Sequence, residues 1–256
     1  VALQLFLHPY NHPVNDLCSN GEIMEVVKVG ESKIVRYIGQ GVVDIELKPT
    51  VYSFTKKRAG VVEGSDEIRL KCCKILCGVL RYHGINHSYR SFKDGHIQSQ
   101  LIYEPNVFQP KDLSEEKINL LPKFCPIEVV VKYNHVGTPL HRYYGMSEFE
   151  TRFGTKITPG SRYDLPMVRF DWRNPNISNS GEFLCDEVMA ETFADYFIRI
   201  NDAKKTAMQA FNALSGFLKK RGLVLQDICF FIDQSGRCIY SEITPDCMRV
   251  ISSEGS

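Results

Sequence analysis

The order of apolar and polar residues predicts several short strands near the start of the chain. Between residues 23 and 47, runs rich in Val and Ile are interrupted at Gly30 and again at Gly39 to Gly41. Short β-branched runs bounded by glycine are typical of consecutive antiparallel strands. We therefore predict a β-meander here, preceded by an irregular N-terminal extension over residues 1–22, which are rich in Pro, Asn and Gly.

A helix is predicted next, because apolar residues recur at helical spacing after the turn-rich segment that precedes Ser65. The recurring positions are Ile68, Cys72, Ile75, Leu76, Val79 and Leu80. We expect about 17 helical residues, with Ser65 as the N-cap and Gly84 at the C-terminal end. The apolar face of this helix should pack on the sheet.

The rest of the pattern predicts both strands and helices. Alternating runs on each side of Asp94-Gly95 are typical of a hairpin, and the β-branched run at 126–134 is typical of a buried strand. Residues 155–181 are rich in Pro, Asn and Ser and indicate a long ordered loop. Helical patterns follow at 184–199 and 203–220, and a glycine turn between two apolar runs predicts a hairpin over 223–243.

These elements predict an α+β fold with two lobes. A chain of 256 residues can form one large domain or two small lobes that share a cleft. The polar segment near residues 109–123 is the natural boundary. We therefore predict an N-terminal lobe at 23–122 and a C-terminal lobe at 123–256.

The charge balance favours a small ligand over a large charged partner. The chain has 31 basic and 30 acidic residues, a net charge of +1. Such a balance creates no extended field for nucleic acid or a membrane surface, so we expect neither partner. Any phosphate group must be bound by a local cluster of residues, and the oligomeric state is left open, with a homo-oligomer among the alternatives.

The cysteines indicate a reducing compartment and no structural metal. There are nine cysteines, an odd number without paired spacing, and no CxxC pair has a second pair or histidines to complete a zinc site. We therefore predict buried free thiols and a cytoplasmic protein. No segment approaches the roughly 20 apolar residues of a membrane-spanning helix.

Two segments resemble a known enzyme family. They are EVVVKYNHVGTPLHRYYG at 128–145 and SEITPDCMRV at 241–250, with weaker agreement at VGESKIVRY and LVLQD. In sequence and in order they are similar to SAICAR synthetase, a purine-biosynthesis ligase. The resemblance implies two lobes, with an antiparallel sheet and a helix in the N-terminal lobe, a larger α+β C-terminal lobe, and ATP bound between them.

The resemblance also implies roles for individual residues. Lys132, Thr138 and Arg249 match the family positions that hold a 5′-phosphate, and two cations with a hydroxyl group suit such a dianion. Asp246 matches the aspartate that orients the azole. Lys33 matches a lysine near the ATP phosphates, and Glu128 ends the segment that resembles the hinge next to adenine. The implied substrates are a phosphorylated ribosyl azole and an amino acid.

The chain departs from the family where magnesium is expected. The family positions for a lysine, a glutamate and an aspartate hold Cys229, Phe231 and Ser241 here. Magnesium requires oxygen ligands, which Phe and Cys do not supply. ATP therefore remains a candidate cofactor, no magnesium site is predicted, and a shifted site using Asp227, Asp233 or Glu242 is an alternative.

Three hypotheses follow from the sequence. The first is a SAICAR synthetase-like ligase that joins aspartate or another amino acid to the carboxylate of a phosphoribosyl azole. The second is a divergent, ATP-independent enzyme that acts on a phosphoribosyl-type substrate in nucleoside or specialised metabolism. The third is a non-catalytic nucleotide-binding protein. The fold alone does not choose between them, because function depends on the site.

Overall fold

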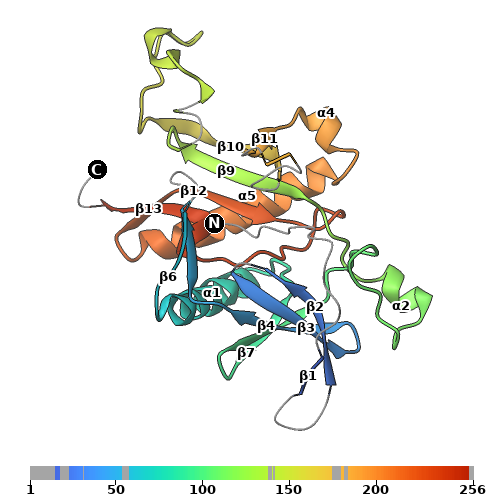
Figure 1. Cartoon of the computed structure of the whole chain (residues 1–256). Helices are drawn as coiled ribbons and strands as arrows, with labels where there is room; N and C mark the ends of the chain where they lie inside the picture. The colour runs from blue at the N-terminus through green and yellow to red at the C-terminus, as the bar shows by residue number, and fades with distance from the viewer. Residues whose placement is uncertain are drawn as a thin grey trace.

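The predicted α+β class is confirmed, and two antiparallel sheets account for most of the strands (Figure 1). The computed structural model describes residues 15–17, 23–30, 32–53, 58–137, 140, 142–174, 180–181 and 184–253. Within this part of the chain, the strands of the first sheet all precede residue 101, and those of the second all follow residue 126. No helix among the described residues is both long and apolar enough to cross a membrane.

The first sheet has the strand order β1-β2-β3-β4-β8-β7. Its strands are β1 (Asn15–Leu17), β2 (Ile23–Val29), β3 (Lys33–Gly39), β4 (Val42–Leu47), β7 (Tyr89–Lys93) and β8 (His96–Gln100). The predicted meander is confirmed as β2 to β4, and the predicted hairpin as β7 and β8. Asp94 and Gly95 have φ values of 51° and 83°, as the tight turn requires. A separate pair, β5 (Thr50–Ser53) and β6 (Arg58–Val61), precedes the first helix.

The predicted helix exists as α1 (Ser65–Tyr82), but its cap and its buried face differ from the prediction. Gly64, with φ 77°, precedes the helix, and Ser65 is its first residue rather than its N-cap. Ile68 and Ile75 are 64% and 55% exposed, whereas Arg69 is buried. The face is rotated because the guanidinium of Arg69 turns inward, where Nη2 donates to the carbonyl of Lys48.

The second sheet has the order β11-β10-β9-β12-β13. Its strands are β9 (Ile127–Asn134), β10 (Arg162–Trp172), β11 (Glu187–Val188), β12 (Leu223–Phe231) and β13 (Met248–Ser252). Successive side chains alternate between its two faces. One face is apolar and packs on α5 (Ile200–Lys219), where the rings of Tyr133 and Phe211 are 5.9 Å apart. The other face carries Glu128, Lys132 and Asp227 in register.

Three predictions for the C-terminal half were wrong. The expected loop at 155–181 contains the 11-residue strand β10, which pairs with β9. The expected helix at 184–199 is only the single turn α4 (Glu191–Ala194). The second arm of the expected hairpin forms no strand with the first and meets it only near the turn, through the bridge Ile232↔Ile239 and a hydrogen bond from the Tyr240 amide to the Phe231 carbonyl. The rest of β12 pairs with β9 and β13 instead. In each case, pairing with a distant segment overrode the local pattern.

Short helical turns complete the described fold. They are α2 (Glu115–Asn119), which Ser114 caps through a hydrogen bond from the Lys117 amide, and two 3-10 turns, η1 (Met146–Glu148) and η2 (Pro245–Cys247). The segment between β12 and η2 runs beside the first sheet, where His87 forms a parallel bridge with Ile239. This contact brings residues 239–246, which contain the ITPD motif, against the N-terminal sheet.

The turn after β12 provides a test of this packing. Gly236 has φ 74°, and a Cβ there would lie 2.6 Å from the Ala203 nitrogen and 2.7 Å from the Arg199 oxygen. Gly95 has a similar φ of 83° and open space around it. Urea unfolding should show that Gly95→Ala loses about 1 kcal/mol from backbone strain, whereas Gly236→Ala loses about 3 kcal/mol from strain plus overlap. Equal losses would contradict the close approach of the turn to α5.

Candidate functional site

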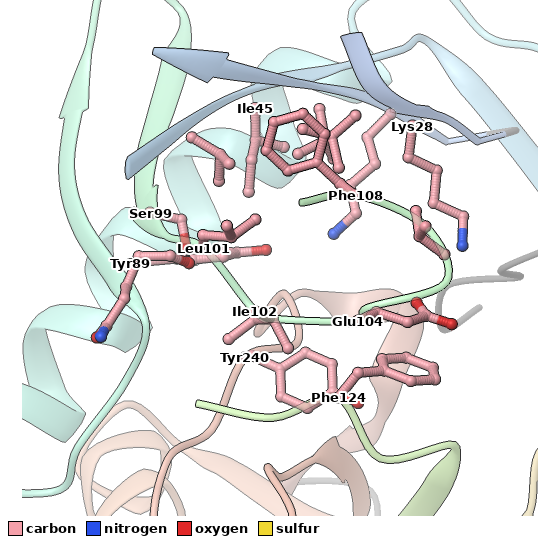
Figure 2. Close-up of a pocket in the computed structure, with 16 residues that line it drawn as sticks. Lys28, Ile45, Tyr89, Ser99, Leu101, Ile102, Glu104, Phe108, Phe124 and Tyr240 are labelled. Atoms are coloured by element: carbon pink, nitrogen blue, oxygen red, sulfur yellow. Dashed lines mark hydrogen bonds between the residues drawn. The ribbon is translucent and has the colours of Figure 1, made fainter. Parts of the chain in front are cut away.

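A cavity lies between the first sheet and the segments that cross to the second (Figure 2). Val27, Val35 and Ile45 line it from the sheet, and Phe124 and Tyr240 line the opposite side. The cavity is open on one side, and the empty space within it and its opening is about 640 Å³. Its mostly apolar walls suit a flat ring or another apolar group.

The two ends of the cavity differ in polarity and exposure. At one end, Tyr89 and Ser99 are each only 2% exposed, and at the other Lys28 and Glu104 are partly exposed (Figure 2). The Tyr89 hydroxyl is buried without a hydrogen-bond partner. Among the described residues, none makes a hydrogen bond or ion pair with the Lys28 ammonium group. Burial lowers the pKa of Lys28 to about 8, although Glu104 opposes this shift.

Lys33 connects this cavity to the second half of the chain. Its Nζ lies 2.9 Å from Glu242 Oε1, and both side chains are almost fully buried. The predicted ATP-contacting lysine therefore lines the cavity, and its charge is matched by a carboxylate from the SEITPD segment. This pair links β3 of the first sheet to the segment between β12 and η2.

A histidine supports the same junction. His87 Nδ1 accepts a hydrogen bond from the Tyr89 amide at 3.0 Å, so the proton of the neutral ring is on Nε2, which donates to the Ser241 carbonyl at 2.9 Å. Burial lowers the pKa of His87 to about 4, so the ring is neutral at physiological pH. His87 thus has a structural role beside the cavity.

The predicted phosphate ligands Lys132 and Arg249 lie together, but they share a carboxylate. Lys132 is 1% exposed, and its Nζ donates to Asp227 Oδ2 at 2.6 Å and to the Val136 carbonyl at 3.1 Å. Arg249 Nη1 donates to the same Asp227 oxygen. Burial lowers the pKa of Lys132, and Asp227 opposes this shift. Asp227, which the sequence suggested only as a metal ligand, is the centre of this cluster.

The third predicted phosphate ligand, Thr138, lies outside the described residues. The residue before it, Gly137, has φ 69° and lies directly against the Arg249 guanidinium, where a Cβ would be 2.5 Å from Cζ. The Arg249 side chain is 50% exposed. The glycine turn and the arginine therefore meet, and part of the guanidinium stays accessible.

The other two predicted site residues, Asp246 and Glu128, do not line the cavity. Asp246 is in η2, with Oδ2 3.9 Å from Arg69 Nη1 on α1. Glu128 is buried on β9 and is not among the residues that line the cavity. Burial raises the pKa of Glu128, while Arg173 lowers it. The residue of this segment that reaches the cavity is Phe124, four positions earlier.

Of the residues that line the cavity, sequence reasoning had named only Lys33 as a site residue, and Lys28, Tyr89 and Tyr240 are among those it missed. The Tyr240 hydroxyl donates to the Cys125 carbonyl at 2.5 Å, and the Tyr240 ring stacks on Phe231 with centroids 5.8 Å apart. Tyr240 could have been noticed because it directly precedes the SEITPD motif. Lys28 and Tyr89 carry no comparable signal, since only the folded sheet brings them together.

The residues at the expected magnesium positions do not fit that ion. Phe231 packs on Tyr240, and Ser241 Oγ accepts a hydrogen bond from the Phe231 amide at 3.0 Å. The Asp233 carboxylate accepts hydrogen bonds within its own turn, from Ser235 Oγ and from two backbone amides. Glu242 pairs with Lys33. In the part of the chain that the structure describes, no three His, Cys, Asp or Glu residues form a metal-binding group.

Sequence comparison with known proteins identifies relatives of this chain. The sequence model of SAICAR synthetase matches residues 53–256. The bifunctional cordycepin biosynthesis cluster protein 3 of Cordyceps militaris is 25% identical over 260 residues, which cover 90% of this chain and 27% of that protein. The chain thus spans about a quarter of the length of that relative.

Solved structures agree in fold. Phosphoribosylaminoimidazole-succinocarboxamide synthase from Ehrlichia chaffeensis superposes with a TM-score of 0.69 at 18% identity, covering 90% of this chain and 86% of that one. A SAICAR synthetase in complex with ADP superposes with a TM-score of 0.67 at 18% identity, covering 89% and 84%. At this identity the likeness establishes the fold.

The shared carboxylate leads to a stability prediction. Asp227→Asn keeps the shape of the side chain but leaves the buried Lys132 without its counter-charge, which should cost about 3 to 5 kcal/mol. Asp164→Asn, at an exposed position of β10, is the matched control and should change stability by less than about 0.5 kcal/mol. Urea unfolding of both variants measures the difference. Similar stabilities would show that Lys132 does not depend on Asp227.

Proposed function

Because this chain belongs to the SAICAR synthetase family, we propose that it binds a purine nucleotide in the cavity between its two sheets. The proposed reaction is the family's joining of an amine, aspartate or another amino acid, to the carboxylate of a phosphoribosyl azole. The observation that carries the proposal is the cavity itself, apolar along its length and bordered by Lys28 and Lys33.

The cavity fits a nucleotide in two respects. Its aliphatic and aromatic walls suit the faces of a purine base, for which stacking on rings such as Phe124 and Tyr240 is favourable. Lys28 suits a phosphate group, since ammonium groups form charge-assisted hydrogen bonds with phosphate oxygens, whereas the charge of Lys33 is matched by Glu242. The solved relative in complex with ADP supports the same assignment.

The azole substrate is proposed to bind at the Lys132–Asp227–Arg249 cluster. Asp227 neutralises one of the two cations, so the cluster keeps a net charge of about +1. The accessible part of Arg249, beside Gly137 and the following Thr138, is the proposed contact for the 5′-phosphate. Lys132 holds Asp227 in place, and Asp246 is proposed to orient the azole from η2. The lobes proposed at 23–122 and 123–256 would meet around this substrate.

A second candidate is an enzyme that acts on a nucleoside or phosphoribosyl substrate without magnesium and ATP. The observation that favours it is the replacement of the expected metal ligands by Phe231 and Ser241, both of which have structural partners here. The relative named for cordycepin biosynthesis also belongs, by its name, to specialised nucleoside metabolism. Both candidates share a nucleoside-binding cavity and differ in the need for ATP.

Calorimetric titration separates these candidates. ATP, ADP and adenosine are titrated into the protein in excess EDTA and again in magnesium chloride, and a 5′-phosphorylated imidazole riboside is titrated separately. The first proposal expects ATP and ADP to bind, and aspartate plus the carboxylated azole to give ATP-dependent product. Binding of adenosine without ATP binding would favour the second candidate. Absence of heat with every nucleotide and nucleoside would overturn both.

Lys28 makes nucleotide binding depend on pH. Its pKa of about 8 in the free protein means that it is charged below pH 8 and loses its proton above it. A bound phosphate favours the charged form, so affinity for ADP should be constant below pH 8 and fall as pH rises toward 10. Lys28→Met should bind ADP more weakly, by roughly tenfold, and show no such fall. A pH profile unchanged by Lys28→Met would exclude Lys28 as a phosphate contact.

A further inference from the structure

The buried end of the cavity contains a hydroxyl group that the protein itself does not satisfy. Tyr89 is 2% exposed, it lines the cavity, and its hydroxyl has no hydrogen-bond partner. Buried polar groups are nearly always paired in folded proteins, because an unpaired one loses its bonds to water without replacement. An unpaired hydroxyl next to empty space therefore indicates a partner that comes from outside the protein.

The ring of Tyr89 is held firmly in this position. Its centroid is 4.5 Å from that of His87 and 6.2 Å from that of Phe92, and its amide is bonded to His87 Nδ1. The ring lies at the end of the cavity that Ser99 also borders (Figure 2). A hydroxyl on a fixed ring can bond only to a ligand atom in one position, and the bond costs little side-chain entropy because the ring is already ordered.

The hydroxyl acts as a donor. Burial raises the pKa of Tyr89 well above its usual value, and the nearby carboxylate of Glu242 raises it further, so the phenol keeps its proton. Ser99 uses its single proton on Ser88 Oγ or the Gln100 carbonyl. Tyr89 is thus an available side-chain donor at this end.

The two ends of the cavity differ in the charged groups that line them. At the Tyr89 end the polar groups are neutral hydroxyls, and the charge of Lys33 is matched by Glu242. The opposite end carries Lys28, which makes no hydrogen bond or ion pair with the described residues, together with Glu104, whose carboxylate favours the charged form of that lysine. A neutral ring edge fits the first end, and an anionic group fits the second, because a phosphate buried without a cation is strongly unfavourable.

We propose that Tyr89 determines ligand specificity by donating a hydrogen bond to an acceptor atom on the edge of a purine base, with the phosphates directed toward Lys28. This inference rests on the proposed nucleotide-binding function and adds the orientation of the ligand and the residue that selects it. The ligand class is a purine nucleotide whose buried edge carries a nitrogen or oxygen acceptor.

Two variants and two ligands test the orientation. AMP and adenosine share a base and differ in the phosphate, so each is titrated calorimetrically into the unmutated protein, Tyr89→Phe and Lys28→Met. Tyr89→Phe should weaken both ligands by the same factor, about three- to tenfold. Lys28→Met should weaken AMP and leave adenosine unchanged. An effect of Tyr89→Phe on AMP alone would show the opposite orientation and overturn the proposal.

Stability measurements separate recognition from a structural role. Tyr89→Phe removes a hydroxyl that makes no hydrogen bond, so the melting temperature of the ligand-free protein should stay the same or rise. Tyr82→Phe, at a residue 87% exposed on α1, is the matched control and should change neither binding nor melting. A clear fall in melting temperature for Tyr89→Phe would show that the hydroxyl has a partner within the protein and would overturn the proposal.

The outcomes also separate this inference from the proposed function. If the unmutated protein binds neither AMP nor adenosine, the proposed function fails, and the role of Tyr89 fails with it. If both ligands bind and Tyr89→Phe binds them equally well, only the role of Tyr89 is overturned.

Discussion

The buried ion pair between Lys33 and Glu242 connects the two sheets, and the shape of the cavity depends on it. Charges removed from water are costly unless they are matched, so each residue requires the other to remain in place. Around this pair, His87 bonds to the Ser241 carbonyl, the Ser88 amide bonds to the Ile239 carbonyl, and Arg69 faces Asp246. Residues 239–242 are therefore held against the first sheet and Asp246 against α1, and Tyr240 of this segment lines one side of the cavity.

The polar face of the second sheet follows the same rule of matched charge. Lys132 and Arg249 meet on Asp227, and Arg169 binds Asp171 through two nitrogens, with its Nε 2.7 Å from Oδ1. Buried basic groups on this face thus have carboxylate partners in the same or neighbouring strands. A phosphate that approaches this face meets the exposed part of Arg249 first. Lys132 is buried, and its ammonium group holds the Asp227 carboxylate that Arg249 also contacts.

Much of the fold was predictable where local pattern and tertiary structure agree. The strands β2 to β4, the β7–β8 hairpin with its Asp94-Gly95 turn, β9 and α5 follow periodicity and turn chemistry. The prediction failed for β10, because its Pro and polar residues resemble a loop and only pairing with β9 makes it a strand. It also misplaced the buried face of α1. Arg69 is buried because its guanidinium donates to the Lys48 carbonyl, and the neighbouring Ile68 is exposed instead.

The sequence by itself determined the α+β class and the family, because these depend on short motifs and their order, and the same motifs proposed Lys33, Lys132 and Arg249 as cations of a site. Only the tertiary structure decided the partners of those cations. Glu242 is brought to Lys33, and Asp227 to Lys132, from more than 90 positions away by the contact between the sheets and by strand pairing. The same contact surrounds the Tyr89 hydroxyl with apolar walls, and no pattern along the chain records that enclosure.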